Sequence, residues 1–107
     1  MSKIGKETAE KIVRKYADAL KKASFSFSQV YLFGSWAKGE NTRWSDIDVA
    51  VVSDEIEKDW DNGRKKLWRL RMGVDNRIEP HGFSKKDFED DSEPMPWEIK
   101  KTGIRVV

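Results

Sequence analysis

The chain has 107 residues, 37% of them charged, and Lys plus Arg exceed Asp plus Glu by only two. This length predicts a single domain over residues 1–107, and the near balance of charge argues against a dominant nucleic-acid-binding surface. The absence of cysteine excludes disulfides and thiolate chemistry. Met1 to Glu10 lack the apolar core of a leader, and no run approaches the roughly 20 apolar residues of a membrane span. Together these observations favour a cytoplasmic protein.

The first predicted element is an amphipathic helix from about Lys6 to Ala23. Apolar residues recur there at helical spacing, namely Ile12, Val13, Tyr16, Ala17 and Leu20. Lysine, arginine, glutamate and aspartate occupy the positions between them. We therefore expect the apolar stripe of this helix to pack on a sheet.

A short buried strand is predicted at Val30 to Phe33, and Gly34-Ser35 ends it abruptly. Glycine lets the backbone approach a ligand closely, and Ser35 offers a hydroxyl and an N–H at the start of a short helix, where phosphate oxygens fit. Lys38, one turn further on, can add a point charge. The alternative is an ordinary hairpin-like loop, with Gly34 and Gly39 only as turn formers.

A second strand is predicted from Asp46 to Val52, and two aspartates stand near its start. Asp46 and Asp48 alternate with apolar residues, so both carboxylates face the same side, with Cα atoms about 7 Å apart. A divalent cation between their tips can hold both, and hard oxygen ligands favour Mg²⁺ or Mn²⁺ over Zn²⁺. The alternative is a solvated strand edge, because the tripeptide alone is common.

The second half of the chain continues the pattern of helices and strands. A helix from Asp59 to Arg71, ended by Gly73, precedes an extended segment from Arg77 to Phe83. A short turn is predicted next, capped by Ser84 and reaching Phe88. A helix that begins after Pro94 and Pro96 and ends at Gly103 follows, and an edge strand is predicted at Ile104 to Val107. The predicted fold class is α/β (α+β), with a small mixed sheet flanked by helices.

Three short motifs carry a resemblance to a known family. They are Phe33-Gly34-Ser35, Ala37-Lys38-Gly39 and Ser45-Asp46-Ile47-Asp48. Their residue types, order and spacing resemble the signature of the minimal (MNT-type) nucleotidyltransferases of the DNA polymerase β superfamily. The resemblance implies a polymerase-β-like core with a nucleotide-binding set and a metal-binding pair. The resemblance assigns the nucleotide to Gly34 and Ser35 and the metals to Asp46 and Asp48, and Lys38 and Ser45 complete the predicted nucleotide-binding set.

The family supplies a third carboxylate from a neighbouring strand, and Glu79 is the predicted residue here. In an extended segment Arg77, Glu79 and His81 share one face, so Glu79 can lie beside the two aspartates as metal ligand and general base. Asp75 is the alternative, although it lies in a predicted turn. His81, the only histidine, can assist proton transfer or bind phosphate, but is predicted to be a hydrogen-bonded structural residue outside the core site.

The predicted function is metal-dependent transfer of an NMP group, AMP in particular, from an NTP to an acceptor hydroxyl with loss of pyrophosphate. The resemblance also implies a HEPN-type protein partner in a toxin-antitoxin pair, and the small domain is suited to a homodimer. The alternatives are a non-catalytic nucleotide- or partner-binding module of the same fold and a scaffold stabilised by calcium or magnesium. The second gives no reason for the Gly-Ser turn.

Five tryptophans stand out in so short a chain. Trp36 and Trp44 flank the predicted phosphate loop, where they can stack on a base or, the favoured reading, meet a second subunit. Trp60, Trp68 and Trp97 lie on predicted helices, where an amphipathic aromatic fills a core or a partner interface.

Overall fold

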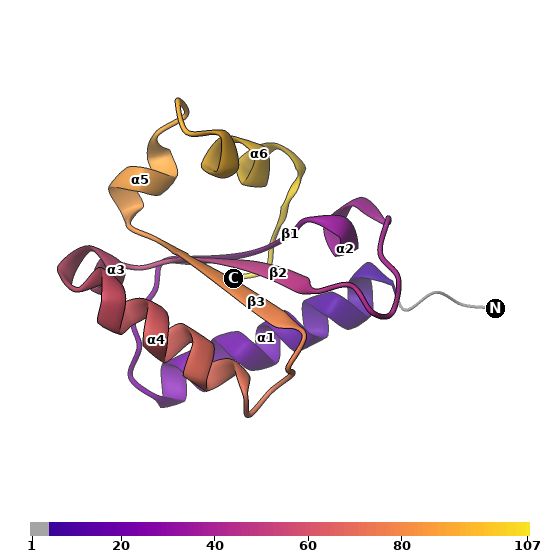
Figure 1. The fold of residues 1–107 in the computed structure, drawn as a ribbon, viewed down its shortest axis with the longest axis horizontal. Helices are drawn as coiled ribbons and strands as arrows, with labels where there is room; N and C mark the ends of the chain where they lie inside the picture. The colour runs from indigo at the N-terminus through magenta and orange to yellow at the C-terminus, as the bar shows by residue number, and fades with distance from the viewer. Residues whose placement is uncertain (1–4) are drawn as a thin grey trace.

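A four-stranded mixed sheet separates two layers of helices (Figure 1). A computed structural model describes residues 5–107; Met1 to Ile4, which begin the segment expected to lack a leader core, lie outside the described residues. The strands are β1 (Gln29–Phe33), β2 (Ile47–Val52), β3 (Ile78–Phe83) and β4 (Ile104–Arg105). The helices are α1 (Lys6–Lys22), α2 (Ser35–Lys38), α3 (Asp54–Lys58), α4 (Trp60–Arg71), α5 (Lys85–Glu89) and α6 (Pro94–Thr102). The predicted fold class is confirmed.

The strand order is β3-β2-β1-β4. Strand β1 runs antiparallel to both β2 and β4, whereas β2 and β3 are parallel. A parallel pair needs a long crossover, which α3 and α4 supply between β2 and β3. Strand β3 is therefore an outer edge of the sheet, and Pro80 within it fits that place, because proline has no backbone N–H to donate to a ladder and an edge strand has a neighbour on one side only.

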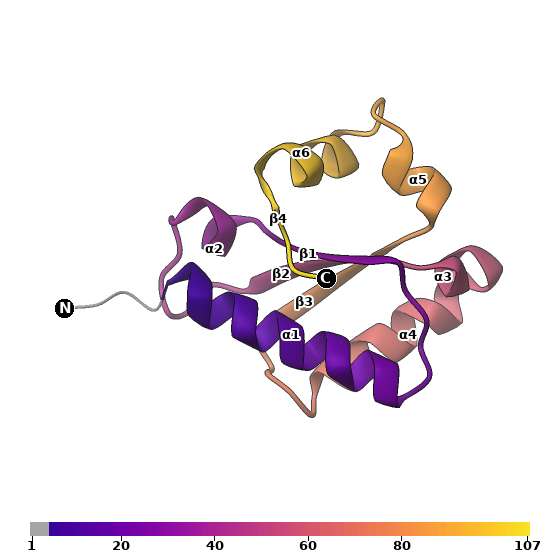
Figure 2. The same cartoon turned by 180° about the vertical axis from the view of Figure 1, so that it is seen from behind.

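Helices α1 and α4 cover one face of the sheet, as Figures 1 and 2 show from opposite sides. The buried side chains of α1 include Val13, Tyr16 and Leu20, which join one apolar cluster with Leu32 and Val49 of the sheet. The Tyr16 hydroxyl donates a 2.7 Å hydrogen bond to the Leu67 carbonyl oxygen of α4. Burial raises the pKa of this tyrosine, as expected for a phenol that stays neutral within the core.

Helices α5 and α6 lie over the other face (Figure 1). Phe88 of α5 and Ile99 of α6 form a second, smaller apolar cluster with Ala50 and Val52 of β2. Because side chains alternate along a strand, Asp48 lies on this same face, towards the start of β2. The smaller cluster thus occupies one end of the face and leaves the acidic residues at the other.

The structure differs from the predicted elements at several places. The predicted turn after Ser84 is the short helix α5, and the predicted edge strand is limited to the two residues of β4. Helix α3 was not predicted, because its five residues contain one buried apolar side chain, that of Ile56, which is too little for a periodic pattern. Helix α4 ends at Arg71, as predicted, with Met72 as its cap; Gly73 follows that cap but is not among the residues with positive φ, so it does not end the helix by a left-handed conformation. No helix in residues 5–107 combines the length and apolar character that a bilayer crossing requires.

Candidate active site

The Gly34 turn is fitted around the carboxylate of Asp48. Gly34 has φ +76°, in the left-handed region that glycine tolerates best, and a Cβ built there would strike Asp48 Oδ2. Phe33, the last residue of β1, pairs with Asp48 across the antiparallel ladder, which fixes this approach. Ser35 then begins the short helix α2, as predicted. The turn and the acid are therefore one structural unit.

Three acidic side chains predicted for the site approach one another. Asp46 directly precedes β2, and Asp48 pairs with Glu79 across the parallel ladder to β3. Burial, followed by the Asp48 carboxylate, raises the pKa of Glu79, and the Asp46 carboxyl adds to the effect by charge and by a side-chain hydrogen bond. Crowded like charges of this kind destabilise an empty site and favour a cation.

His81 lies within this group, which corrects the prediction that it is a structural residue outside the core site. One ligand atom each of Asp48, Glu79 and His81 lie within 4.8 Å of one another. His81 Nε2 is 3.6 Å from Asp48 Oδ1, and this buried atom has no hydrogen-bond partner among the described residues. The Phe33 ring packs edge-on against the imidazole, with ring centroids 5.2 Å apart. The alternation of residues along β3, which places His81 on the face of Glu79, was the signal for its position.

These side chains fit a divalent cation. Two carboxylates offer the oxygen donors that Mg²⁺ and Mn²⁺ prefer, and the imidazole nitrogen adds a donor that no neighbour uses. Burial first, and then the neighbouring carboxylates of Asp48 and Asp46, raise the pKa of Glu79, and a bound cation would offset the repulsion between these acids. Asp46, Asp48, Glu79 and His81 are the residues that can hold such an ion.

Asp75, the alternative third acid, is engaged elsewhere. Arg77 donates to Asp75 from its backbone N–H, its Nε and its Nη2, the last at 2.9 Å. The Arg77 guanidinium beside it lowers the pKa of Asp75. The geometry brings Glu79, and not Asp75, to Asp48.

Lys38 and Ser45, two residues predicted to bind nucleotide, have protein partners in the structure. Lys38 Nζ lies 3.0 Å from Glu98 Oε1 of α6, which raises the pKa of Lys38. Ser45 Oγ accepts a 2.9 Å hydrogen bond from the Thr42 backbone N–H and so shapes the loop before β2. Their nucleotide contacts stay a prediction.

The five tryptophans differ in burial in a way that the sequence did not predict. Trp36 of α2 is fully buried in the core and donates from Nε1 to the Ser45 carbonyl oxygen at 3.1 Å, so neither base stacking nor an interface describes it. Trp44, in contrast, is 79% exposed beside Arg43. The tryptophans of the later helices are also exposed, which rules out a core role for them and leaves the interface prediction standing; they are Trp60, Trp68 and Trp97.

A groove of about 290 Å³ opens beside the acidic group along the outer edge of β3. Glu79 and His81 form part of its lining. Across from them, Trp60, Arg64 and Trp68 of α4 line it, together with Met95. The groove therefore leads from the α4 side to Glu79 and His81.

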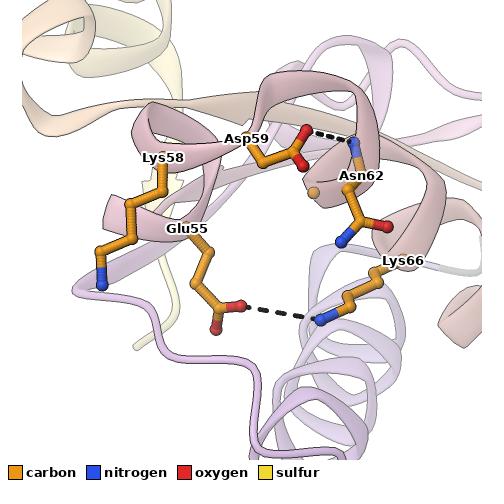
Figure 3. Close-up of a pocket in the computed structure, with 6 residues that line it drawn as sticks. Glu55, Lys58, Asp59, Asn62 and Lys66 are labelled. Atoms are coloured by element: carbon orange, nitrogen blue, oxygen red, sulfur yellow. Dashed lines mark hydrogen bonds and ion pairs between the residues drawn. The ribbon is translucent and has the colours of Figure 1, made fainter.

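A second, smaller pocket of about 100 Å³ lies between α3 and α4, beyond the other end of β2 (Figure 3). Three of its charged groups have partners: Glu55 Oε1 lies 3.9 Å from Lys66 Nζ, and Asp59 accepts a hydrogen bond from the Asn62 backbone N–H at the start of α4. Such pairing is typical of a helix junction. We assign this pocket a structural role.

Comparison with known proteins agrees with this geometry. A protein from Methanocaldococcus jannaschii whose name proposes a protein adenylyltransferase is 41% identical over 46 residues, which are 42% of this chain and 46% of that protein. The chain thus spans about half the length of the curated relative that it matches. A crystal structure of a toxin-antitoxin with AMP-PNP shares the fold at 23% identity and a TM-score of 0.61, covering 88% of this chain and 71% of the other.

A crystal structure of a Sulfolobus solfataricus protein, proposed to be a nucleotidyltransferase, also shares the fold. It is 20% identical with a TM-score of 0.58, covering 94% of this chain and 84% of the other. The sequence model of the nucleotidyltransferase domain family matches residues 11–105, which is nearly the whole chain and includes the turn and all the acids of the site. The chain therefore belongs to the nucleotidyltransferase domain family.

Proposed function

We propose that this chain transfers an AMP group from ATP to an acceptor hydroxyl, with Mg²⁺ or Mn²⁺ as cofactor. The observation that carries the proposal is the approach of Asp46, Asp48 and Glu79 to one another beside the Gly34 turn. Membership of the nucleotidyltransferase domain family supports the reaction type. The protein named as a proposed adenylyltransferase, and the toxin-antitoxin crystallised with AMP-PNP, support an adenine nucleotide as donor.

In the proposed reaction the chain's own residues bind, orient and move a proton. The backbone and hydroxyl of Ser35 hold the triphosphate, and Lys38 exchanges Glu98 for a phosphate oxygen. When bound, divalent cations neutralise charge on the phosphate oxygens and lower the pKa of the acceptor hydroxyl. Glu79 accepts the hydroxyl proton, and the acceptor oxygen forms a bond to the α-phosphorus. The bond from that phosphorus to the bridging oxygen breaks, and its electron pair leaves with pyrophosphate.

The proposal extends to a partner protein. The resemblance to minimal nucleotidyltransferases points to a HEPN-type protein that carries the acceptor hydroxyl, with this chain as the antitoxin of the pair. The toxin-antitoxin structural relative supports such a pair, and the groove with its exposed Trp60 and Trp68 supports a protein approaching Glu79. A homodimer through the same tryptophans is the alternative use of this surface.

The test is transfer of label from α-³²P-ATP to the protein encoded beside this chain, in the presence of Mg²⁺. We expect Asp46→Asn and Asp48→Asn each to lower the rate by about 10³-fold or more, because several kcal/mol of transition-state stabilisation depend on the metal. Asp59→Asn is the matched control, since Asn62 can still be capped and the site keeps its acids. It should keep the wild-type rate.

The opposite result has a defined meaning. If the wild-type chain binds ATP and the partner but transfers no label, and if Asp46→Asn/Asp48→Asn binds the partner equally well, the chain is a non-catalytic binding module. Equal transfer by wild type and by the double variant would instead remove these two acids from the reaction. Analytical ultracentrifugation of the chain alone and with its partner separates the homodimer from the heterocomplex.

A further inference from the structure

The imidazole of His81 has no assigned task in the proposed reaction. We propose that His81 Nε2 is a direct ligand of the catalytic metal, so that Asp48, Glu79 and His81 form a mixed oxygen and nitrogen site that prefers a first-row transition ion to Mg²⁺. The proposal rests on the metal site of the proposed function and specifies its ligands. It concerns binding of the ion, and therefore stands or falls separately from transfer.

The position of the His81 Nε2 atom fits a metal ligand. It belongs to the set of ligand atoms that lie within 4.8 Å of one another, a spacing that one ion can bridge by small side-chain movements. Residue alternation along β3 puts Glu79 and His81 on the same face, and Asp48 pairs with Glu79 on the adjacent strand. Three donors thus come from two paired strands, which are rigid supports for a site.

This nitrogen is buried and lacks a hydrogen bond among the described residues. A buried polar atom without a partner destabilises the fold, so its presence calls for a ligand. Asp48 Oδ1, at 3.6 Å, is too distant to accept a hydrogen bond from it. The separation of His81 Nε2 and Asp48 Oδ1 is therefore better explained by an ion that both atoms bind than by a hydrogen bond between them.

The imidazole is also held in a fixed orientation. The Phe33 ring meets the imidazole edge-on at 5.2 Å between centroids and restricts its rotation. Phe33 also immediately precedes Gly34, the residue fitted around Asp48. The same segment therefore positions the carboxylate and the imidazole together, as a metal site requires of its surroundings.

The choice of ion follows from ligand chemistry. Mg²⁺ is a hard cation that takes oxygen ligands and keeps several waters, whereas imidazole binds well to first-row transition ions. A site with one nitrogen and two carboxylates should therefore discriminate against Mg²⁺ more than a site of three carboxylates does. His81→Gln, which replaces the nitrogen by an amide, should reduce that discrimination.

The chain contains a single histidine, which makes the test direct. Tag-free protein is loaded with Mn²⁺ alone, and again with Mn²⁺ and the α,β-methylene analogue of ATP, and electron spin-echo envelope modulation is recorded. We expect modulation from a directly bound ¹⁴N nucleus, replaced by the ¹⁵N pattern when only histidine is labelled with ¹⁵N. This isotope exchange identifies His81 without any substitution that disturbs folding.

Affinity supplies the second readout. In His81→Gln, the Mn²⁺ dissociation constant should rise at least about tenfold and that of Mg²⁺, measured by competition, should change by less than about threefold. Trp68→Phe, which alters the same groove without removing a donor, should leave both constants at the wild-type values. Circular dichroism confirms that each variant is folded.

Two results overturn the proposal. One is the absence of histidine nitrogen modulation from the wild-type protein under both loading conditions, which includes the case in which Mn²⁺ does not bind. The other is an unchanged ratio of Mn²⁺ to Mg²⁺ affinity in folded His81→Gln. Either result leaves the label-transfer test to decide the proposed function, so the two failures are distinguishable.

Discussion

Two polar regions lie at opposite ends of β2 and differ in how their charged side chains are arranged. At the start of the strand, Asp46 and Asp48 gather with Glu79, so like charges meet. Beyond its end, Glu55 faces Lys66 in the pocket between α3 and α4 (Figure 3). Opposite charges and capped N–H groups stabilise the second region, whereas the first is stabilised only when something else binds. Both regions border a pocket, so a pocket alone does not distinguish them. The clustering of like charges does, and it indicates the start of β2 as the functional region.

The sharpest way to break this comparison is to neutralise one charge in each region. Asp48→Asn should abolish transfer, by about 10³-fold or more, yet raise the free energy of unfolding of the metal-free protein by about 0.5–1 kcal/mol, because repulsion with Glu79 is relieved. Glu55→Ala should lower that free energy by about 1 kcal/mol, since it removes the acceptor of the Ser26 backbone N–H, while transfer stays within about twofold.

Urea unfolding followed by tryptophan fluorescence, with EDTA present, measures both changes. Addition of Mg²⁺ or Mn²⁺ should stabilise the wild-type chain and the Glu55→Ala variant but not Asp48→Asn. If Asp48→Asn were less stable than wild type in EDTA, the acids would be structural, and the contrast between the two regions would not hold.

The next prediction compares two glycines that share a backbone conformation. Gly34 and Gly39 have φ +76° and +75°, so alanine is strained at both and should cost about 1 kcal/mol of stability. A Cβ at Gly39 meets no atom of the described residues within 4 Å, whereas at Gly34 it strikes Asp48. Gly34→Ala should therefore displace a metal ligand and lower transfer about 100-fold. Gly39→Ala should keep transfer near the wild-type value.

The measurement is label transfer per folded molecule, with Mn²⁺ affinity as a second readout. Equal losses in the two glycine variants would mean that backbone strain, and not contact with Asp48, governs the turn. Equal retention would mean that Asp48 can move aside, and the turn would then have no fixed relation to the acid.

Much of this architecture was predictable from the chain because its signals are local. The apolar stripe of α1 and the alternation through Asp46 and Asp48 are repeated patterns that can be recognised without knowledge of the tertiary contacts. The position of Glu79 followed from alternation in β3 once the family pattern was recognised, and the structure brings it to Asp48. The roles of these residues in binding and transfer stay predictions until they are tested.

The features that were not predicted depend on contacts between distant residues. Trp36 is buried because α2 turns it into the core against the Ser45 carbonyl, and no local pattern encodes that direction. The pairing of Lys38 with Glu98 joins residues 60 positions apart. The absence of a hydrogen bond at His81 Nε2 is visible only when all neighbours are in place.

A smaller effect is expected from Ser53, the cap of the unpredicted helix α3. Its buried Oγ accepts from the Glu55 N–H at 3.0 Å and donates to the Ser26 carbonyl at 2.5 Å. Ser53→Ala should lower the free energy of unfolding by about 1–2 kcal/mol, because both groups lose a partner near the paired pocket. Transfer per folded molecule should be unchanged, and a loss of transfer would connect the two ends of β2.

The smallest predicted effect, and the one that tests the electrostatic argument by pH, is at Asp75. Because Arg77 lowers the pKa of Asp75 in the folded protein, the ionised carboxylate stabilises the fold above the unfolded-state pKa of about 3.9, and this stabilisation is lost as the pH falls through the folded-state value. Asp75→Asn should be less stable than wild type by about 0.5–1 kcal/mol near pH 7, and the difference should vanish towards pH 2. Asp18→Asn, on the exposed surface of α1, controls for loss of one charge. A difference between Asp75→Asn and wild type that stays constant from pH 7 to pH 2 would show that shape, and not the Arg77 charge, makes Asp75 stabilising.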